Sequence, residues 1–363
     1  MAEIDIRKFV DINIQAPVVR SVEATRKTVV LFTPEGVSGT IATYDSYESA
    51  STALSDATFP NTLAYLKVYF DNGGLECKVV QGIGYSALTK AIITALKNEE
   101  IVIACVVPSA DAAAGYTAIK DLAGRINADT TIYGVNEKIL LARNISESDE
   151  DSVKNFIVKY STILGAEMTI AAYFSQVNIY KENSIQDYCF TAETITAEDI
   201  DTTLFETLMT NNYNVDISLG GAVRDLGGNA KDGRDAINEY IRIILHQTLT
   251  QRLVNLLVTK LKNSDGVSKI YTTLVQELEI YRNAGYLTTD KVWTANDLTK
   301  VYNQQQYTII EKGTPLPAGY FIRVLPMSAL NDAQRTARMC PPVYVIIADQ
   351  YGIRQITIQG EVI

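Results

Sequence analysis

One histidine limits the chemistry that this chain could perform. His246 is the single histidine among 363 residues, so sites built from several histidines are excluded and a Ser/His/Asp triad would have to use this residue. It lies beside Gln247 and Thr248 in a long stretch of helical periodicity. A general base must reach the proton that it abstracts, and a histidine in this setting is more typical of helix packing. We therefore expect no catalytic, metal-binding or cofactor-binding residues.

The four cysteines form no ligand pattern. Cys77, Cys105, Cys189 and Cys340 stand far apart, and their spacing matches neither a zinc site nor a CxxC motif. Each has apolar or aromatic neighbours, as in IVIACVV and DYCFT. Free cysteine is among the most often buried residues, so we expect buried free thiols of a protein made in a reducing cytoplasm.

A glycine-rich segment and its acidic residues are the remaining candidates for chemistry. Five glycines lie between residues 220 and 233, but neither GxGxxG nor GxxxxGK[ST] occurs there. The segment is expected to be a turn region that precedes a long helix. Asp225, Asp232 and Asp235 are the acids that an enzyme could use. As loop residues they are expected to be solvated.

Composition is that of a folded, acidic protein. Hydrophobic residues make up 47% and charged residues 20%, and 42 acidic against 32 basic residues give a net charge of −10. The length allows two or three domains. An acidic surface repels phosphate backbones, so no direct nucleic-acid binding is expected. No apolar run reaches the roughly 18–20 residues of a membrane span, and the N-terminus lacks the apolar core of a secretory signal.

Hydrophobic periodicity predicts an α/β layer from about residue 75 to 180. Strands are expected at LECKVVQG, IVIACVVP, TIYGVNEKILLARN and MTIAAYFSQVNIY. Helices are expected at NTLAYLKVYFDN, SALTKAIITALKNEE and GYTAIKDLAGRIN, and in SESDEDSVKNFIVKYSTIL, where acids open the segment. Such alternation is typical of parallel strands. Beyond the glycines, long helices precede the strands YFIRVLP and VYVIIAD.

Both ends of the chain carry a short alternating strand. The apolar positions are Val10, Ile12 and Ile14 at the start and Ile356, Ile358 and Val362 at the end. A lone strand is not stable in water, so each must add to a sheet. The sheet could belong to the same domain or to a neighbouring copy, and reciprocal donation between copies would make rings or helical arrays.

Several segments, taken in order, resemble the tail sheath proteins of contractile bacteriophages and contractile injection systems. They are YLKVYFDNGGLECKVVQ, the stretch from NISESDEDSVKNF to ENSIQDY, the stretch from NVDISLGGAVRDLGG to LVNLLVTK, and SDGVSKIYTTLVQELEIYRNAGYL. The two terminal strands match the family's exchanged arms in position. The resemblance implies a mixed α/β fold with an N-terminal arm at 1–20, an outer α/β domain at 21–215, an inner α+β domain at 216–349 that faces a tube, and a C-terminal arm at 350–363.

The resemblance also implies a function and partners. The chain would be a structural, non-enzymatic subunit that polymerises as stacked rings around a tail tube and contracts to drive the tube through a cell envelope. Partners would be further copies, the tail tube protein, and baseplate and terminator proteins, in a virion or similar particle made in the bacterial cytoplasm. Five basic residues are candidates for facing the tube: Arg234, Arg242, Arg252, Lys260 and Lys262.

Two alternatives stay open from the sequence. Another structural protein of a phage tail or baseplate would share the composition, although a tube protein is usually shorter and mostly β. An α/β enzyme would place its site at the carboxyl ends of the parallel strands.

Overall fold

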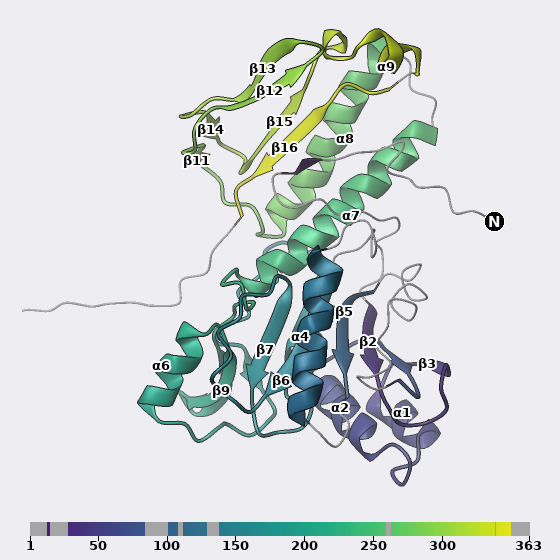
Figure 1. Ribbon diagram of the computed structural model, residues 1–363, viewed down its shortest axis with the longest axis vertical. Coiled ribbons are helices and arrows are strands. Elements are labelled where there is room, and N and C mark those ends of the chain that lie inside the picture. The colour runs from purple at the N-terminus through teal and green to yellow at the C-terminus, as the bar shows by residue number, and fades with distance from the viewer. Residues whose placement is uncertain are drawn as a thin grey trace, which may run out of the picture.

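The computed structural model describes residues 13–14, 28–83, 101–107, 112–128, 138–258, 263–337 and 339–349. Within these residues the chain forms a large lobe around a nine-stranded sheet and a small lobe around a three-stranded sheet (Figure 1). Helices α7 (Ala236–Val258) and α8 (Asn263–Asn283) lie between the two lobes. The mixed α/β class expected from the sequence is confirmed.

The large sheet is mostly parallel. Its order is β3-β4-β2-β5-β6-β7-β9-β10-β8, and β4 to β9 run parallel in that order. The strands are β2 (Thr28–Phe32), β3 (Ile41–Tyr44), β4 (Cys77–Val80), β5 (Ile101–Val106), β6 (Ile139–Asn144), β7 (Phe156–Tyr160), β8 (Ala192–Glu193), β9 (Asn214–Leu219) and β10 (Ala222–Leu226).

Alternation along the strands explains the layers on the two faces. In β2, Val29 and Leu31 belong to the core on one face, and Val30 and Phe32 belong to the core on the other. Successive side chains of a strand point to opposite faces, so a strand covered on both sides is apolar throughout. The first face is covered by α1 (Tyr47–Ala53), α2 (Pro60–Asp71), α5 (Met168–Gln176) and the first half of α7, and the second by α4 (Ala112–Ala128) and α6 (Thr202–Thr210).

Two elements of the layer differ from the expectation. Residues 168–176, expected to be a strand, form helix α5. Residues 156–160, expected to lie in a helix, form strand β7 in the interior of the sheet, between β6 and β9. The acids before β7 instead pair with α4, since Lys120 lies 3.0 Å from Asp149 and 2.6 Å from Asp151. The helix expected at 86–100 lies outside the described residues.

The glycine-rich segment is a turn region, as expected. Gly220 and Gly221, both with positive φ, connect β9 to β10, and further glycines lead into α7. The predicted domain boundary between 215 and 216 falls inside β9, because the large sheet continues to Leu226. The division therefore lies after β10 if the sheet defines the first domain.

The small lobe is a three-stranded sheet with a helix on one face and a hairpin on the other. Its order is β1-β16-β15, formed by β1 (Asn13–Ile14), β16 (Val343–Ile347) and β15 (Tyr320–Val324). Tyr320 on β15 donates a 2.6 Å hydrogen bond to Glu279 on α8. The hairpin is β12 (Leu298–Tyr302) with β13 (Gln305–Ile310), and the lobe also holds β11 (Lys291–Val292), β14 (Pro315–Leu316) and α9 (Asp332–Thr336).

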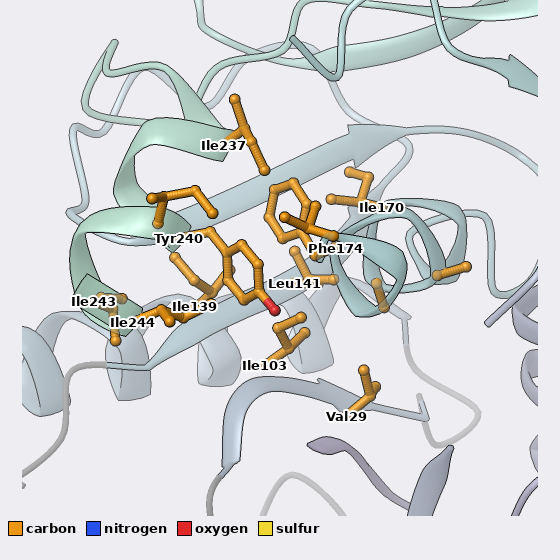
Figure 2. Packing of buried hydrophobic residues seen from close by; sticks show 14 of the residues in the cluster. Val29, Ile103, Ile139, Leu141, Ile170, Phe174, Ile237, Tyr240, Ile243 and Ile244 are labelled. Carbon is orange, nitrogen blue, oxygen red and sulfur yellow. The ribbon is translucent and has the colours of Figure 1, made fainter. Parts of the chain in front are cut away.

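One apolar core runs through both lobes. It includes Val29 in β2, Tyr240 in α7, Leu278 in α8 and Val345 in β16, all of them buried. Figure 2 shows Tyr240 of α7 beside Phe174 of α5, with Ile139 and Leu141 of β6 close by. Helix α7 therefore packs on the large sheet and on α8, which in turn packs on the small sheet. Among the described helices, none is both long enough and apolar enough to cross a membrane.

Candidate functional site

The edge of β16 is the place where a terminal strand joins the small sheet. β1 runs parallel to β16, with Asn13 opposite Tyr344 and Ile14 opposite Val345. Tyr344 packs in a core with Tyr307 of the β12–β13 hairpin, whereas Val345 belongs to the core that contains α8. A strand received at this edge therefore extends a sheet that is covered on both faces.

The structure places only part of the predicted arms. Ile14 lies in β1, whose partner β16 belongs to the same chain. The other five predicted positions lie outside the described residues: Val10, Ile12, Ile356, Ile358 and Val362. Pairing of these strands with another subunit stays a prediction.

Of the five predicted basic residues, the three that the structure describes differ in exposure. Arg242 is buried, with 7% of its surface exposed, and its guanidinium lies 2.7 Å from Glu239. It therefore offers no charge to a tube, because a long helix packed on the large sheet buries residues on several sides. Arg234 is exposed at the start of α7 and lies 3.2 Å from Glu239.

Arg252 is the predicted basic residue that remains on the exposed side of α7. Its Nε donates to Glu277 on α8 over 3.0 Å, and 47% of the side chain is accessible. Lys260 and Lys262 lie outside the described residues. A contact of these basic residues with a tube stays a prediction.

A buried charge cluster at the end of the large sheet is the feature that sequence reasoning missed. Lys159 Nζ lies 2.6 Å from Glu193 Oε2, 2.7 Å from Asp216 Oδ1 and 3.3 Å from Asp225 Oδ2. These side chains come from β7, β8, β9 and β10, and at most 2% of each is exposed. The available signal was a lysine in FIVKY and an aspartate in NVDIS, each a charge within an apolar strand.

This cluster corrects the interpretation of Asp225 as a solvated loop acid. Asp225 is fully buried in β10, where it contacts the ammonium group of Lys159. Three converging carboxylates resemble the ligands of a divalent cation, but the cation among them is Lys159. A buried ion pair needs its counter-charge, so the arrangement is structural in the first instance.

Asp232 and Asp235 have local structural roles. Asp232 lies 3.5 Å from Arg234, and burial raises its pKa above the ordinary value. Asp235 caps α7, because its carboxylate accepts the Asn238 N–H over 3.1 Å. Asp235 and Asp187 also line a cavity of about 250 Å³ beside Gly285. The cap explains Asp235 without a substrate.

The helix N-terminus at which an α/β enzyme would bind an anion binds a carboxylate of the protein itself. Strand order reverses around β2, and ligands of such folds bind at the carboxyl ends of the strands there. Glu35, just after β2, accepts the N–H groups of Asn61 at 3.1 Å and Thr62 at 2.9 Å. These donors form the N-terminus of α2, the position where a phosphate would bind. A carboxylate of the chain thus takes the place of an anionic ligand.

His246 and the cysteines agree only partly with the expectation. His246 is buried in α7, with 6% of its surface exposed. Cys77 and Cys105 are buried free thiols, and burial raises the pKa of each above its ordinary value. Cys189 is half-buried and Cys340 is exposed, so burial was a wrong expectation for Cys340. It lies in the CPP segment before β16 rather than within a strand.

Comparisons with known proteins agree on one fold. Residues 237–362 match the family model described as E217 tail sheath protein gp31-like, C-terminal domain. A search of curated proteins finds no match. A chain in the 6-fold symmetrised baseplate of the anti-feeding prophage (AFP) superposes with a TM-score of 0.69 and 15% identity, covering 97% of this chain and 98% of that one.

Two sheath structures give similar results. A chain of the contracted AFP helical sheath has a TM-score of 0.63 and 16% identity, with 95% of each chain covered. A chain of the contracted PVC sheath complex, from an extracellular contractile injection system, has a TM-score of 0.64 and 12% identity, covering 97% of this chain and 96% of that one. Over nearly its whole length, the chain therefore has the fold of contractile sheath proteins.

Proposed function

We propose that this protein is a structural subunit of a contractile tail sheath, which polymerises helically around a tail tube and contracts to drive that tube through a cell envelope. The observation that carries the proposal is the shared fold with chains of two contracted sheaths, over 95% and 97% of this chain. The tail sheath family model supports it independently, since it matches residues 237–362 in the helical and small-lobe half.

The terminal strands would connect the subunits. In the assembly, the edge of β16 would receive residues 13–14 of a neighbouring copy in place of the chain's own β1, and residues 350–363 would join another copy. Strand addition relies on backbone hydrogen bonds, which are the same whichever chain supplies the strand. Because such contacts connect unlike surfaces head to tail, they build rings or helices rather than closed pairs.

The partners follow from the same proposal. Copies of the chain would form the sheath, the baseplate would bind one end and a terminator protein the other, and the inner surface would contact the tail tube. The particle would be a phage tail or a related injection particle, assembled in the bacterial cytoplasm. The last part of α7 and the following residues, with Arg252, Lys260 and Lys262, are the proposed contact with the tube.

An enzyme is the weaker proposal. Contraction in this proposal uses free energy stored during assembly, without hydrolysis of a nucleotide. The N-terminus of α2, where an α/β nucleotide enzyme would bind phosphate, already binds the carboxylate of Glu35. A baseplate component is the closer alternative, because a chain in the AFP baseplate shares the fold.

Electron microscopy of the purified protein tests the proposal. A sheath subunit should form long hollow cylinders of uniform width, alone or with its tube protein. An enzyme should instead give monodisperse particles of about the subunit mass, which is 40.0 kDa. A baseplate component should form rings of one size that do not elongate. Either of these last two results would refute the sheath proposal.

A further inference from the structure

The buried cluster around Lys159 holds more negative than positive charge. One ammonium group faces three carboxyl groups, those of Glu193, Asp216 and Asp225, with at most 2% of any side chain exposed. Fully ionised, the four groups would carry a net charge of about −2 in a site without access to water. Burying unpaired charge is costly, so such groups usually change protonation instead.

Lys159 has more acceptors around it than protons to donate. Its ammonium group donates to Thr169 Oγ1 at 2.6 Å, Tyr188 OH at 3.3 Å and Glu193 Oε2 at 2.6 Å. Its nitrogen also lies 2.7 Å from Asp216 Oδ1 and 3.3 Å from Asp225 Oδ2. An ammonium group has three protons, so it cannot donate to all five acceptors at once, and three ionised carboxylates would not be fully satisfied.

Strand register brings the two aspartates together. Asp216 in β9 lies directly opposite Asp225 in β10 in an antiparallel pair. Like charges opposite each other across strands are destabilising. One carboxyl oxygen of each aspartate and one of Glu193 lie within 4.8 Å of one another, so the three charges repel one another when all are ionised.

Within the described residues, Lys159 is the cation that forms ion pairs with the three carboxyl groups. Tyr188, in the segment before β8, donates its hydroxyl proton to Glu193 and adds no charge. Glu167, just before α5, is a further buried acid, and burial raises its pKa although Arg143 and Lys159 act in the opposite direction.

We propose that Asp216 and Asp225 retain protons at neutral pH, and that these protons lock β8, β9 and β10 onto β7. When the protons are lost, three carboxylates face one ammonium group, and the end of the large sheet opens. The cluster is thus an alkali-sensitive lock at the edge of the lobe. The inference concerns the single chain and does not depend on the proposed sheath.

The direction of the pKa shifts agrees with this geometry. Burial, together with Glu193, raises the pKa of Asp216 and Asp225 well above the ordinary value, although Lys159 acts in the opposite direction. Burial alone would raise the pKa of Glu193 as well, but Lys159 holds it below its ordinary value. Groups with a raised pKa in the folded state stabilise at low pH, and this stabilisation is lost as pH rises through that pKa. The stabilisation is fully present below the ordinary carboxyl pKa and declines as pH rises from there through the raised pKa, so the cluster should hold the strands less firmly toward alkaline pH.

Replacement of Asp225 by Asn tests the lock. An asparagine imitates the protonated, uncharged acid, so Asp225→Asn should fold at pH 7 and lose much of the alkaline sensitivity. Amide hydrogen exchange is measured by mass spectrometry from pH 6 to 9.5 and corrected for the intrinsic rate. In the wild type, exchange in 192–226 should rise at least tenfold more than in β2. In Asp225→Asn the rise should be several-fold smaller.

Control variants distinguish the effect of the cluster from a general effect of pH on the whole protein. Asp199→Asn removes an exposed acid from the same part of the chain and should keep the wild-type profile. Asp216→Asn is the second variant in case Asp225→Asn does not fold. Infrared spectra of the wild type at pH 7 should contain the band of a protonated carboxyl group. Absence of that band, or equal pH profiles for the wild type and a folded cluster variant, would overturn the proposal.

Discussion

The ring of Tyr240 on α7 stacks on the ring of Phe174 on α5, with centroids 4.8 Å apart and an angle of 14° between the planes. Both side chains are completely buried in the core that runs through the two lobes. Figure 2 shows the pair next to Ile139 and Leu141 of the large sheet. This contact is one of the places where the helix that leads to the small lobe is fixed to the large one.

Truncation of Tyr240 should destabilise the whole chain. Tyr240→Ala removes the stacked ring and leaves a cavity, which typically costs about 3–5 kcal/mol for a large aromatic side chain. Tyr240→Phe is the matched control, because the hydroxyl group has no hydrogen-bond partner within the described residues. It should cost less than about 1 kcal/mol. Urea unfolding followed by circular dichroism measures both, and a similar loss in the two variants would contradict the packing argument.

A glycine near the end of β4 should not tolerate a side chain. Gly82 has φ +69°, and a Cβ there would lie 2.3 Å from Ser38 Cα. Gly39 also has positive φ, +83°, but a Cβ there meets no atom within 4 Å. Gly39→Ala should therefore cost only the backbone strain, about 1–2 kcal/mol. Gly82→Ala should lower the free energy of unfolding clearly more, since the backbone at Ser38 must move to make room for the new Cβ. Thermal unfolding of the two variants measures this difference. Equal midpoint temperatures would refute the steric explanation.

Removal of either terminal strand should abolish polymerisation without unfolding the subunit. Deletion of 1–15 takes away β1, and deletion of 353–363 takes away the predicted C-terminal strand. Ile358→Pro is a smaller change that removes one ladder donor. We expect soluble monomers with wild-type circular dichroism that form no cylinders in the microscope. Ordered cylinders from any of the three variants would contradict the role of that strand in joining subunits.

Reversal of charge after α7 should weaken binding to the tube. Lys260→Glu with Lys262→Glu changes the proposed contact and spares Arg252, whose partner Glu277 is buried and would be left without its counter-charge. The matched control is Lys291→Glu with Lys300→Glu, two exposed lysines of β11 and β12. Co-sedimentation with tubes should fall with rising salt for the wild type, as exposed charge contacts do. Equal binding by both double variants would exclude the contact.

Sequence periodicity predicted the regular parts of the fold and failed where burial hides the period. Strand β5 and helices α2 and α4 appear where they were expected. Helix α5 has mostly apolar residues around its axis, because seven of its nine residues are buried. A short apolar run of this kind cannot be distinguished from a buried strand by its pattern. Strand β7 was predicted as part of a helix because the acidic residues before it are typical of a helix N-terminus. In the structure, Asp149 and Asp151 form ion pairs with Lys120 instead.

The charge cluster could not be predicted from local sequence patterns, for a different reason. Lys159, Glu193, Asp216 and Asp225 come from four strands, and only the strand order places them together. A charged residue in an apolar strand indicates that a buried counter-charge is present. The pattern does not identify the residue that carries this counter-charge. In the same way, Arg242 looks like a surface residue until the helix around it proves to be covered by both lobes.

The core that extends from Val29 in β2 to Val345 in β16 has a mechanical consequence. Because densely packed interiors transmit strain rather than absorb it, the two lobes should turn together as one stiff lever. In the proposed sheath, a small rotation about the strands at the tube would carry the large lobe through a wide arc. The torque of one subunit would then reach the next through the strands at its ends, and the angle at the inner surface would set how far the outer surface travels.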